Sequence, residues 1–199
     1  MASNFLKSTT TVLLLISALS IATAFILDID GDPLYNGGQY YIIPQSLGFG
    51  AGLTLKSKAD SLPCPFYIGR ENDETSYGMP VTIASPFKIR NIIPSLLISI
   101  VFKGDDNPNI CMQPLEWQVI ADASTGKSYI ATGGSGGAFN PTTTFSIEQI
   151  GININMYKIR NAGVSDVGFF EKDGLLGLTD DIPLHVVFRK AFDVLSMKV

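Results

Sequence analysis

Residues 26–44 have the sequence ILDIDGDPLYNGGQYYIIP. A segment rich in Asp, Gly, Pro and Asn is followed at 39–43 by the apolar run QYYII. Gly, Pro, Asn and Asp favour turns, whereas aromatic and β-branched residues favour strands. The stretch therefore predicts a turn-rich segment that leads into a β-strand, and the rest of the chain repeats this alternation.

Short strand-like runs between turn-forming clusters continue to the end of the chain, and almost nothing predicts a helix. Their spacing, mostly about eight to fifteen residues, is typical of an all-β barrel or sandwich. Twelve strands also divide into three sets of four, as a β-trefoil requires. No clear internal repeat is visible, so strand spacing alone does not distinguish a β-trefoil from another barrel or a sandwich. The expected strands are 39–43, 52–56, 65–69, 80–84, 96–102, 116–121, 127–131, 144–150, 155–160, 167–171, 175–179 and 184–190.

The first 24 residues have the features of a secretory signal peptide. Lys7 precedes the apolar run VLLLISALSIA, and small residues follow at 22–24. This pattern predicts cleavage after residue 24, with a retained signal anchor as the alternative. The apolar run is too short for a comfortable transmembrane span. We therefore expect a secreted or vacuolar protein, detached from the membrane, with one domain of about 175 residues over 25–199.

Charge and cysteine content narrow the function classes. The chain has a net charge of −4 and no basic cluster, so nucleic acid is not an expected partner. Its two cysteines are Cys64 and Cys111. In an oxidising compartment we expect them to pair, closing a loop of about fifty residues that stabilises the fold by about 4 kcal/mol. Two buried free thiols are the alternative.

Several short motifs suggest chemistry, but none is complete. Residues 28–32 (DIDGD) match the start of a calcium loop, yet its twelfth position is Gln39 and not Glu, so an acidic turn is expected. Residues 133–139 (GGSGGAF) lack the Lys-Ser/Thr of a phosphate-binding loop and predict a hairpin loop. His185 is the only histidine, and it lies within an apolar strand pattern with no visible partner. We therefore expect no metal, no cofactor and no enzymatic activity, and we assign Trp117 to the core.

Residues 84–94 (ASPFKIRNIIP) place two cations, Lys88 and Arg90, inside an apolar run. The stretch falls between the fourth and fifth expected strands, which makes it a surface loop. Pro86 fixes its own φ and drives the preceding residue towards an extended conformation, and β-branched Ile89 is also stiff. The loop is therefore predicted to be extended and to present Lys88 outward, in the shape that a protease active site binds.

Taken together, these segments resemble the plant Kunitz-type inhibitors, the soybean trypsin inhibitor family, along essentially the whole mature length. The most specific match is D-x-x-G-x-P-L-x-N-G-G-x-Y-Y-I within residues 26–44. The other matching segments are CP (64–65), SPFKIR (85–90), CMQPLEWQV (111–119), MYKIR (156–160) and PLHVVFRK (183–190). The resemblance implies a β-trefoil of about twelve strands with pseudo-threefold symmetry.

The resemblance also implies a function, that of a secreted inhibitor of a trypsin-like serine protease, and we expect it to act as a monomer. Lys88 would be the primary specificity residue and Lys88–Ile89 the scissile bond. Asn36 matches the family asparagine that hydrogen-bonds the loop backbone, and Cys64 and Cys111 match the first family disulfide. The implied reactive loop consists of Ser85, Pro86, Phe87, Lys88, Ile89 and Arg90.

The sequence departs from the family pattern in its last third. Typical members carry a second disulfide there, whereas residues 157–174 contain no cysteine. Single-disulfide members exist, so the resemblance stands. The alternative function is a non-inhibitory or differently targeted Kunitz-like binding or storage protein, with a cysteine protease or a carbohydrate as its ligand.

Overall fold

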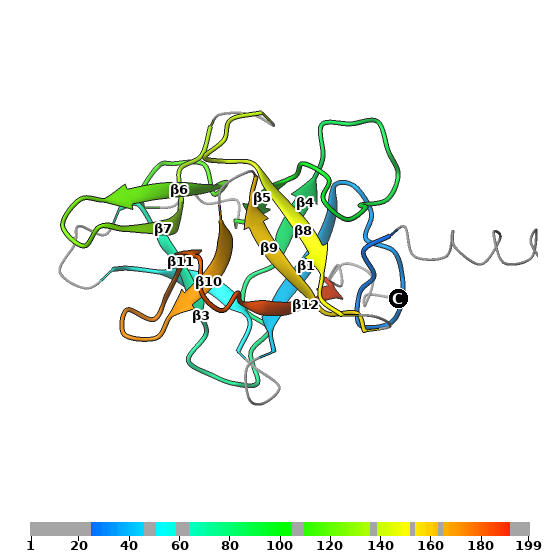
Figure 1. Ribbon diagram of the computed structural model, residues 1–199, viewed down its shortest axis with the longest axis horizontal. Coiled ribbons are helices and arrows are strands. Elements are labelled where there is room, and N and C mark those ends of the chain that lie inside the picture. The colour runs from blue at the N-terminus through cyan, green and yellow to red at the C-terminus, as the bar shows by residue number, and fades with distance from the viewer. Residues whose placement is uncertain are drawn as a thin grey trace, which may run out of the picture.

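The computed structural model describes residues 25–45, 51–58, 64–104, 110–135, 139–151, 154–162 and 165–191. These ranges contain twelve strands and no helix (Figure 1). The strands are β1 (Gly38–Pro44), β2 (Leu53–Lys56), β3 (Tyr67–Arg70), β4 (Val81–Ala84), β5 (Ser99–Phe102), β6 (Trp117–Asp122), β7 (Lys127–Thr132), β8 (Phe145–Gln149), β9 (Tyr157–Asn161), β10 (Asp166–Phe170), β11 (Leu175–Thr179) and β12 (His185–Lys190).

Six of the strands form a closed antiparallel barrel. Strand β1 pairs with β12 and β4, β4 pairs with β5, and β9 pairs with β8 and β12. Between β5 and β8 the barrel is completed by Ile98 and Phe145, which exchange backbone hydrogen bonds of 2.8 and 2.9 Å. Backbone groups around the barrel are thus paired on both sides, as a closed sheet requires.

Three hairpins cover one end of this barrel and reveal the symmetry of the chain. They are β2–β3, β6–β7 and β10–β11, and their strands β3, β7 and β11 also pair with one another. The contacts between hairpins join Tyr67 to Ala131, Gly177 to Tyr129 and Leu175 to Gly69. Because β3, β7 and β11 are four strands apart, the chain consists of three four-strand repeats. The fold is the β-trefoil that the family resemblance implied.

The strand positions expected from the sequence are confirmed, with two informative differences. Strand β5 begins at Ser99 and not at residue 96, because Ser95 has a φ of 60° and the Leu96 N–H donates to Ile93 C=O in a turn. The expected hairpin loop at 133–139 is wrong. It joins β7 to β8, and among the described residues these strands pair with other neighbours.

Aromatic rings fill the centre of the barrel. Trp117 is fully buried, and its ring lies 5.9 Å from those of both Phe102 and Phe145. The indole meets Phe145 edge-on, an arrangement that adds about 1 kcal/mol beyond the area that it buries. The assignment of Trp117 to the core is confirmed.

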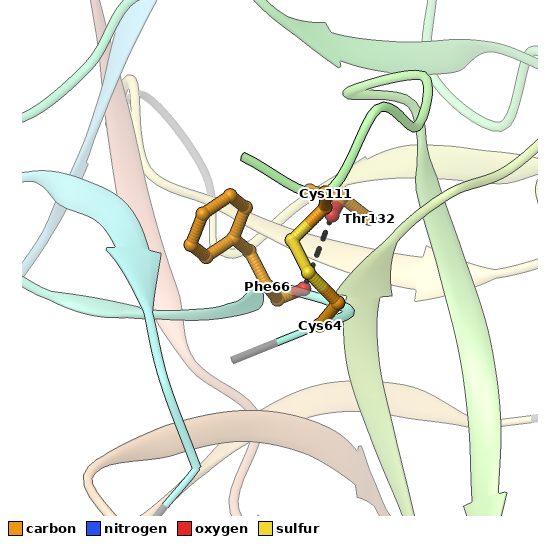
Figure 2. Close-up of a disulfide and its surroundings, with 4 residues drawn as sticks. All are labelled: Cys64, Phe66, Cys111 and Thr132. Carbon is orange, nitrogen blue, oxygen red and sulfur yellow. Dashed lines mark hydrogen bonds between the residues drawn. A yellow bond between two sulfur atoms is a disulfide. The ribbon is translucent and has the colours of Figure 1, made fainter. Parts of the chain in front are cut away.

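The two cysteines form one disulfide, as predicted, so the free-thiol alternative is wrong. Cys64 and Cys111 join the segment before β3 to the segment before β6, with their Cα atoms 5.4 Å apart. Figure 2 shows the bond beside Thr132, whose hydroxyl donates to Phe66 C=O at 3.3 Å. The disulfide therefore joins the segment between the two strands of the β2–β3 hairpin to the connection that leads into the β6–β7 hairpin.

The expected signal peptide, residues 1–24, lies outside the described ranges and stays a prediction. Within those ranges, no helix has the length and apolar character needed to cross a membrane.

Candidate functional site: the loop between β4 and β5

The support of this loop begins in the N-terminal segment, residues 26–36. Two buried tyrosines of the barrel hold the segment: the Tyr157 hydroxyl accepts from Leu27 N–H and the Tyr40 hydroxyl from Tyr35 N–H, each at 2.8 Å. Burial raises the pKa of both phenols above its ordinary value. The hydroxyls therefore stay neutral at physiological pH and keep the segment against the barrel.

The acidic stretch in this segment forms a turn, as expected. Asp28 is 2% exposed, and its Oδ1 accepts hydrogen bonds from the backbone N–H groups of Asp30 and Asp32 at 3.0 and 2.9 Å. Asp commonly caps its own turn in this way. The turn reverses the chain so that residues 33–36 run back towards the β4–β5 loop.

A second turn places Asn36 at its tip. The Tyr35 C=O accepts from Gly38 N–H at 2.9 Å, and Gly37 has a φ of 80°. A positive φ at the third position of such a turn favours glycine, because a Cβ would strain the backbone. The Gly37 N–H also donates to Ile83 C=O of β4 at 2.8 Å. The glycine pair thus ties Asn36 to the strand from which the loop departs.

The apolar residues of the loop explain why it is anchored so firmly. Ile92 N–H donates to Leu34 C=O at 2.8 Å, and Ile26 N–H donates to Ile92 C=O at 3.0 Å. The side chains of all three residues are completely buried. The return limb of the loop is thus anchored in the core at Ile92, although the adjacent Ile93 is exposed.

Asn36 binds the backbone of that tip on both sides of Lys88. Its Nδ2 lies 3.2 Å from Ser85 C=O, 3.1 Å from Phe87 C=O and 3.2 Å from Ile89 C=O. Its Oδ1 accepts from Ser85 N–H at 2.7 Å, and its own N–H donates to the next carbonyl, that of residue 90, at 2.9 Å. Since a side-chain amide has two hydrogens, the three carbonyls share them.

Lys88 is exposed at the tip, as are Pro86 and Phe87 before it. Ile89 N–H donates to Phe87 C=O at 2.8 Å, which closes a three-residue turn centred on Lys88. The loop is therefore less extended at this point than the sequence suggested. Arg90, the other cation, lies with its guanidinium carbon 5.5 Å from the centre of the Tyr35 ring. Among the described residues no such ring or ion-pair contact involves Lys88, so the two cations are held differently.

A second loop contacts the tip through Phe139, a residue that sequence reasoning missed. The Phe87 and Phe139 rings meet edge-on at 6.2 Å, and 68% of Phe139 is exposed. The glycine-rich run around Phe139 indicated only a loop. Nothing in the sequence places Phe139 beside a residue 52 positions earlier, because that contact depends on the closed barrel.

This geometry can be compared with known proteins. A family model described as "Trypsin and protease inhibitor", Kunitz_legume, matches residues 26–190. The chain belongs to this Kunitz family. The family consists of inhibitors and not enzymes, which confirms the expected class of protein.

Relatives of the Kunitz chain support the assignment along its length. An alpha-amylase/subtilisin inhibitor of Oryza sativa subsp. japonica is 31% identical over 194 residues, which cover 90% of this chain and 94% of the relative. A Kunitz-type trypsin inhibitor of Glycine max is 29% identical over 187 residues, covering 88% and 89%. Among solved structures, soybean trypsin inhibitor in complex with porcine pancreatic trypsin matches with a TM-score of 0.70 and 29% identity, covering 84% of this chain and 99% of that chain.

Proposed function

We propose that this Kunitz inhibitor acts on trypsin-like serine proteases, with Lys88 as the specificity residue and Lys88–Ile89 as the bond offered to the enzyme. Trypsin has a carboxylate at the base of its specificity pocket. The Lys88 stem would fill such a pocket, and its ammonium would pair with the carboxylate directly or through water. Since Lys88 is exposed at the tip of the loop, the protease would reach it without moving the barrel.

The observation that carries the proposal is the position of Asn36 across this bond. Its amide nitrogen contacts Phe87 C=O on one side of the Lys88–Ile89 bond and Ile89 C=O on the other, at 3.1 and 3.2 Å. A flexible peptide loses about 0.5–1.5 kcal/mol per ordered side chain when it binds. A loop held by Asn36 is already ordered, so it loses less.

The same support would make the loop a poor substrate. If the protease attacks the Lys88 carbonyl, the new amine at Ile89 must depart for hydrolysis to finish. Ile89 C=O is bound to Asn36, and Ile92 further along the chain is anchored in the core. The amine would therefore stay beside the acyl carbon, where the bond can form again.

The test is titration of trypsin with the purified protein at stoichiometric ratio, with subtilisin and α-amylase assayed in parallel because one relative is named for them. We expect trypsin activity to fall to near zero at one equivalent. Lys88→Ala should weaken inhibition by about 3 kcal/mol, more than a hundredfold in Kd. Lys88→Leu or Lys88→Phe should shift preference towards chymotrypsin-like enzymes.

A matched control is Lys172→Ala, which removes an exposed lysine from the turn between β10 and β11. It should inhibit as well as the parent protein. Equal inhibition by Lys88→Ala would show that Lys88 is not the specificity residue. Failure to inhibit any trypsin-like enzyme would favour the binding or storage alternative.

We also propose that the protein passes through the secretory pathway and acts as a monomer. The Cys64–Cys111 disulfide supports this route, since disulfides persist in oxidising compartments. N-terminal sequencing of the native protein should find a start near Phe25, and light scattering should give the mass of one chain. A native chain that retains residues 1–24 would contradict cleavage.

A further inference from the structure

Two cations share one aromatic ring beside the inhibitory loop. The Arg90 guanidinium carbon lies 5.5 Å from the centre of the Tyr35 ring, and the Lys190 ammonium lies 5.8 Å from the same centre. Tyr35 is 38% exposed, and both cations are exposed. Cations are attracted to the face of an aromatic ring at such distances. We call Tyr35, Arg90 and Lys190 the basic shelf.

Backbone contacts fix the parts of this shelf in place. Tyr35 N–H donates to the buried Tyr40 hydroxyl at 2.8 Å, and Asn36 N–H donates to Arg90 C=O at 2.9 Å. Lys190 lies at the end of β12, directly opposite Tyr40 of β1. The ring and both cations are therefore attached to paired strands and to the loop support.

No acidic side chain of the described residues forms an ion pair with the shelf. The ion pairs in those ranges use other cations, such as Lys58, Lys127 and Lys158. The net charge of the chain is −4, so the shelf is a local positive surface on an acidic protein. Two like charges held at one ring repel each other, and an external anionic surface would relieve that repulsion.

We propose that the basic shelf selects proteases whose surface is acidic beside the active site, on the side that receives residues after the cleaved bond. This inference rests on the proposed function, because Arg90 follows Lys88–Ile89 by one residue. At 0.1 M salt charges interact over about 10 Å, so the charges nearest the contact dominate association. The shelf therefore acts mainly on the association rate.

The test compares an anionic with a cationic pancreatic trypsin, two enzymes with the same pocket and opposite surface charge. Net charge alone predicts that the acidic inhibitor associates faster with the cationic trypsin. The shelf predicts the reverse, with association about threefold to tenfold faster for the anionic enzyme at 0.1 M salt. At about 1 M salt, where screening extends over about 3 Å, the two rates should converge.

Substitutions test whether the shelf causes the difference between the two association rates. Arg90→Gln with Lys190→Gln should bring the ratio of the two association rates to about one or below. Lys172→Gln, an exposed cation elsewhere, should leave the ratio unchanged.

The shelf proposal would be overturned by equal association rates for both trypsins, by faster association with the cationic trypsin, or by an equal effect of Lys172→Gln. The proposed inhibition would stand in each of these cases. Absence of inhibition of either trypsin would overturn the proposed function and the shelf with it.

Discussion

Replacing Asn36 by Ala tests whether rigidity makes the loop an inhibitor. The change removes a side chain whose Nδ2 lies within 3.2 Å of three loop carbonyls and whose Oδ1 accepts from Ser85 N–H. Lys88 stays in place, so the first encounter with trypsin should be almost unchanged. We expect faster dissociation and faster cleavage, because the new amine can move away before the bond forms again.

The size of the effect follows from the hydrogen bonds that are lost. Two amide hydrogens and one oxygen support about three bonds, each worth about 1 kcal/mol, so the upper bound is about 3 kcal/mol. The loop tip is partly exposed, and water can replace some of these bonds. We therefore expect a loss of about 1–2 kcal/mol, or about a fivefold to thirtyfold faster dissociation rate.

The assay has two readouts. Dissociation is measured by diluting the preformed complex into excess substrate, and cleavage by mass spectrometry for the Lys88–Ile89 cut after long incubation with catalytic trypsin. Asn36→Asp separates the two halves of the amide, since it keeps an acceptor for Ser85 N–H and removes the donors. Dissociation and cleavage rates equal to those of the parent in Asn36→Ala would refute the reasoning, and rigidity would then have another source.

Three further predictions concern other parts of the molecule. Reduction of Cys64–Cys111, 47 positions apart, should lower the free energy of unfolding by about 4 kcal/mol in denaturant titration yet leave trypsin inhibition intact; unchanged stability would contradict this. Phe139→Ala removes the ring that meets Phe87, so the dissociation rate should rise about twofold to tenfold; an unchanged rate would show that the pair does not support the loop. Burial raises the pKa of Tyr40 above 10.0, so its stabilising contribution is present below pH 10 and is lost as pH rises through the raised value. Unfolding measured across this range should show less alkaline loss in Tyr40→Phe.

The positions of the strands could be predicted from the sequence because they depend on local alternation. Each strand is short and bounded by turn residues, and β11 has the expected bounds, 175–179. The pairing of β3 with β7 and of β7 with β11 could not be predicted in this way. Those contacts join residues far apart in the chain, and only the family resemblance indicated them.

In the candidate site, too, local features could be predicted from the sequence, whereas contacts between distant residues could not. The exposure of Lys88 followed from two prolines and a loop position, which are local features. The stacking of Arg90 on Tyr35 and the packing of Phe139 on the loop depend on three-dimensional closure. Sequence reasoning therefore placed Lys88 on an exposed loop and, through the family resemblance, named Asn36 as its support, but it missed the contacts of Tyr35 and Phe139.

Ion pairs join neighbouring strands in the last third of the chain, the region in which, by the family resemblance, typical members carry a second disulfide. Lys158 contacts Glu148 at 3.4 Å and Asp166 at 3.0 Å, and Arg160 contacts the same two carboxylates at 3.4 and 2.9 Å. These pairs join β8, β9 and β10. Partly exposed pairs contribute about 0–1 kcal/mol each and weaken with salt, whereas a disulfide contributes about 2–4 kcal/mol.

Among the described residues, no side chain of the β4–β5 loop forms an ion pair with this cluster. The support of the loop nevertheless borders the same strands: Leu27 N–H donates to the Tyr157 hydroxyl of β9 at 2.8 Å, and Ser95 N–H donates to Ile147 C=O of β8 at 2.9 Å. These bonds are backbone and tyrosine contacts and not ion pairs, so high salt should weaken the cluster more than it weakens the support of Lys88. We therefore expect high salt to lower stability more than inhibition, because the charges that join the last strands and the asparagine that holds the proposed inhibitory loop take part in different interactions.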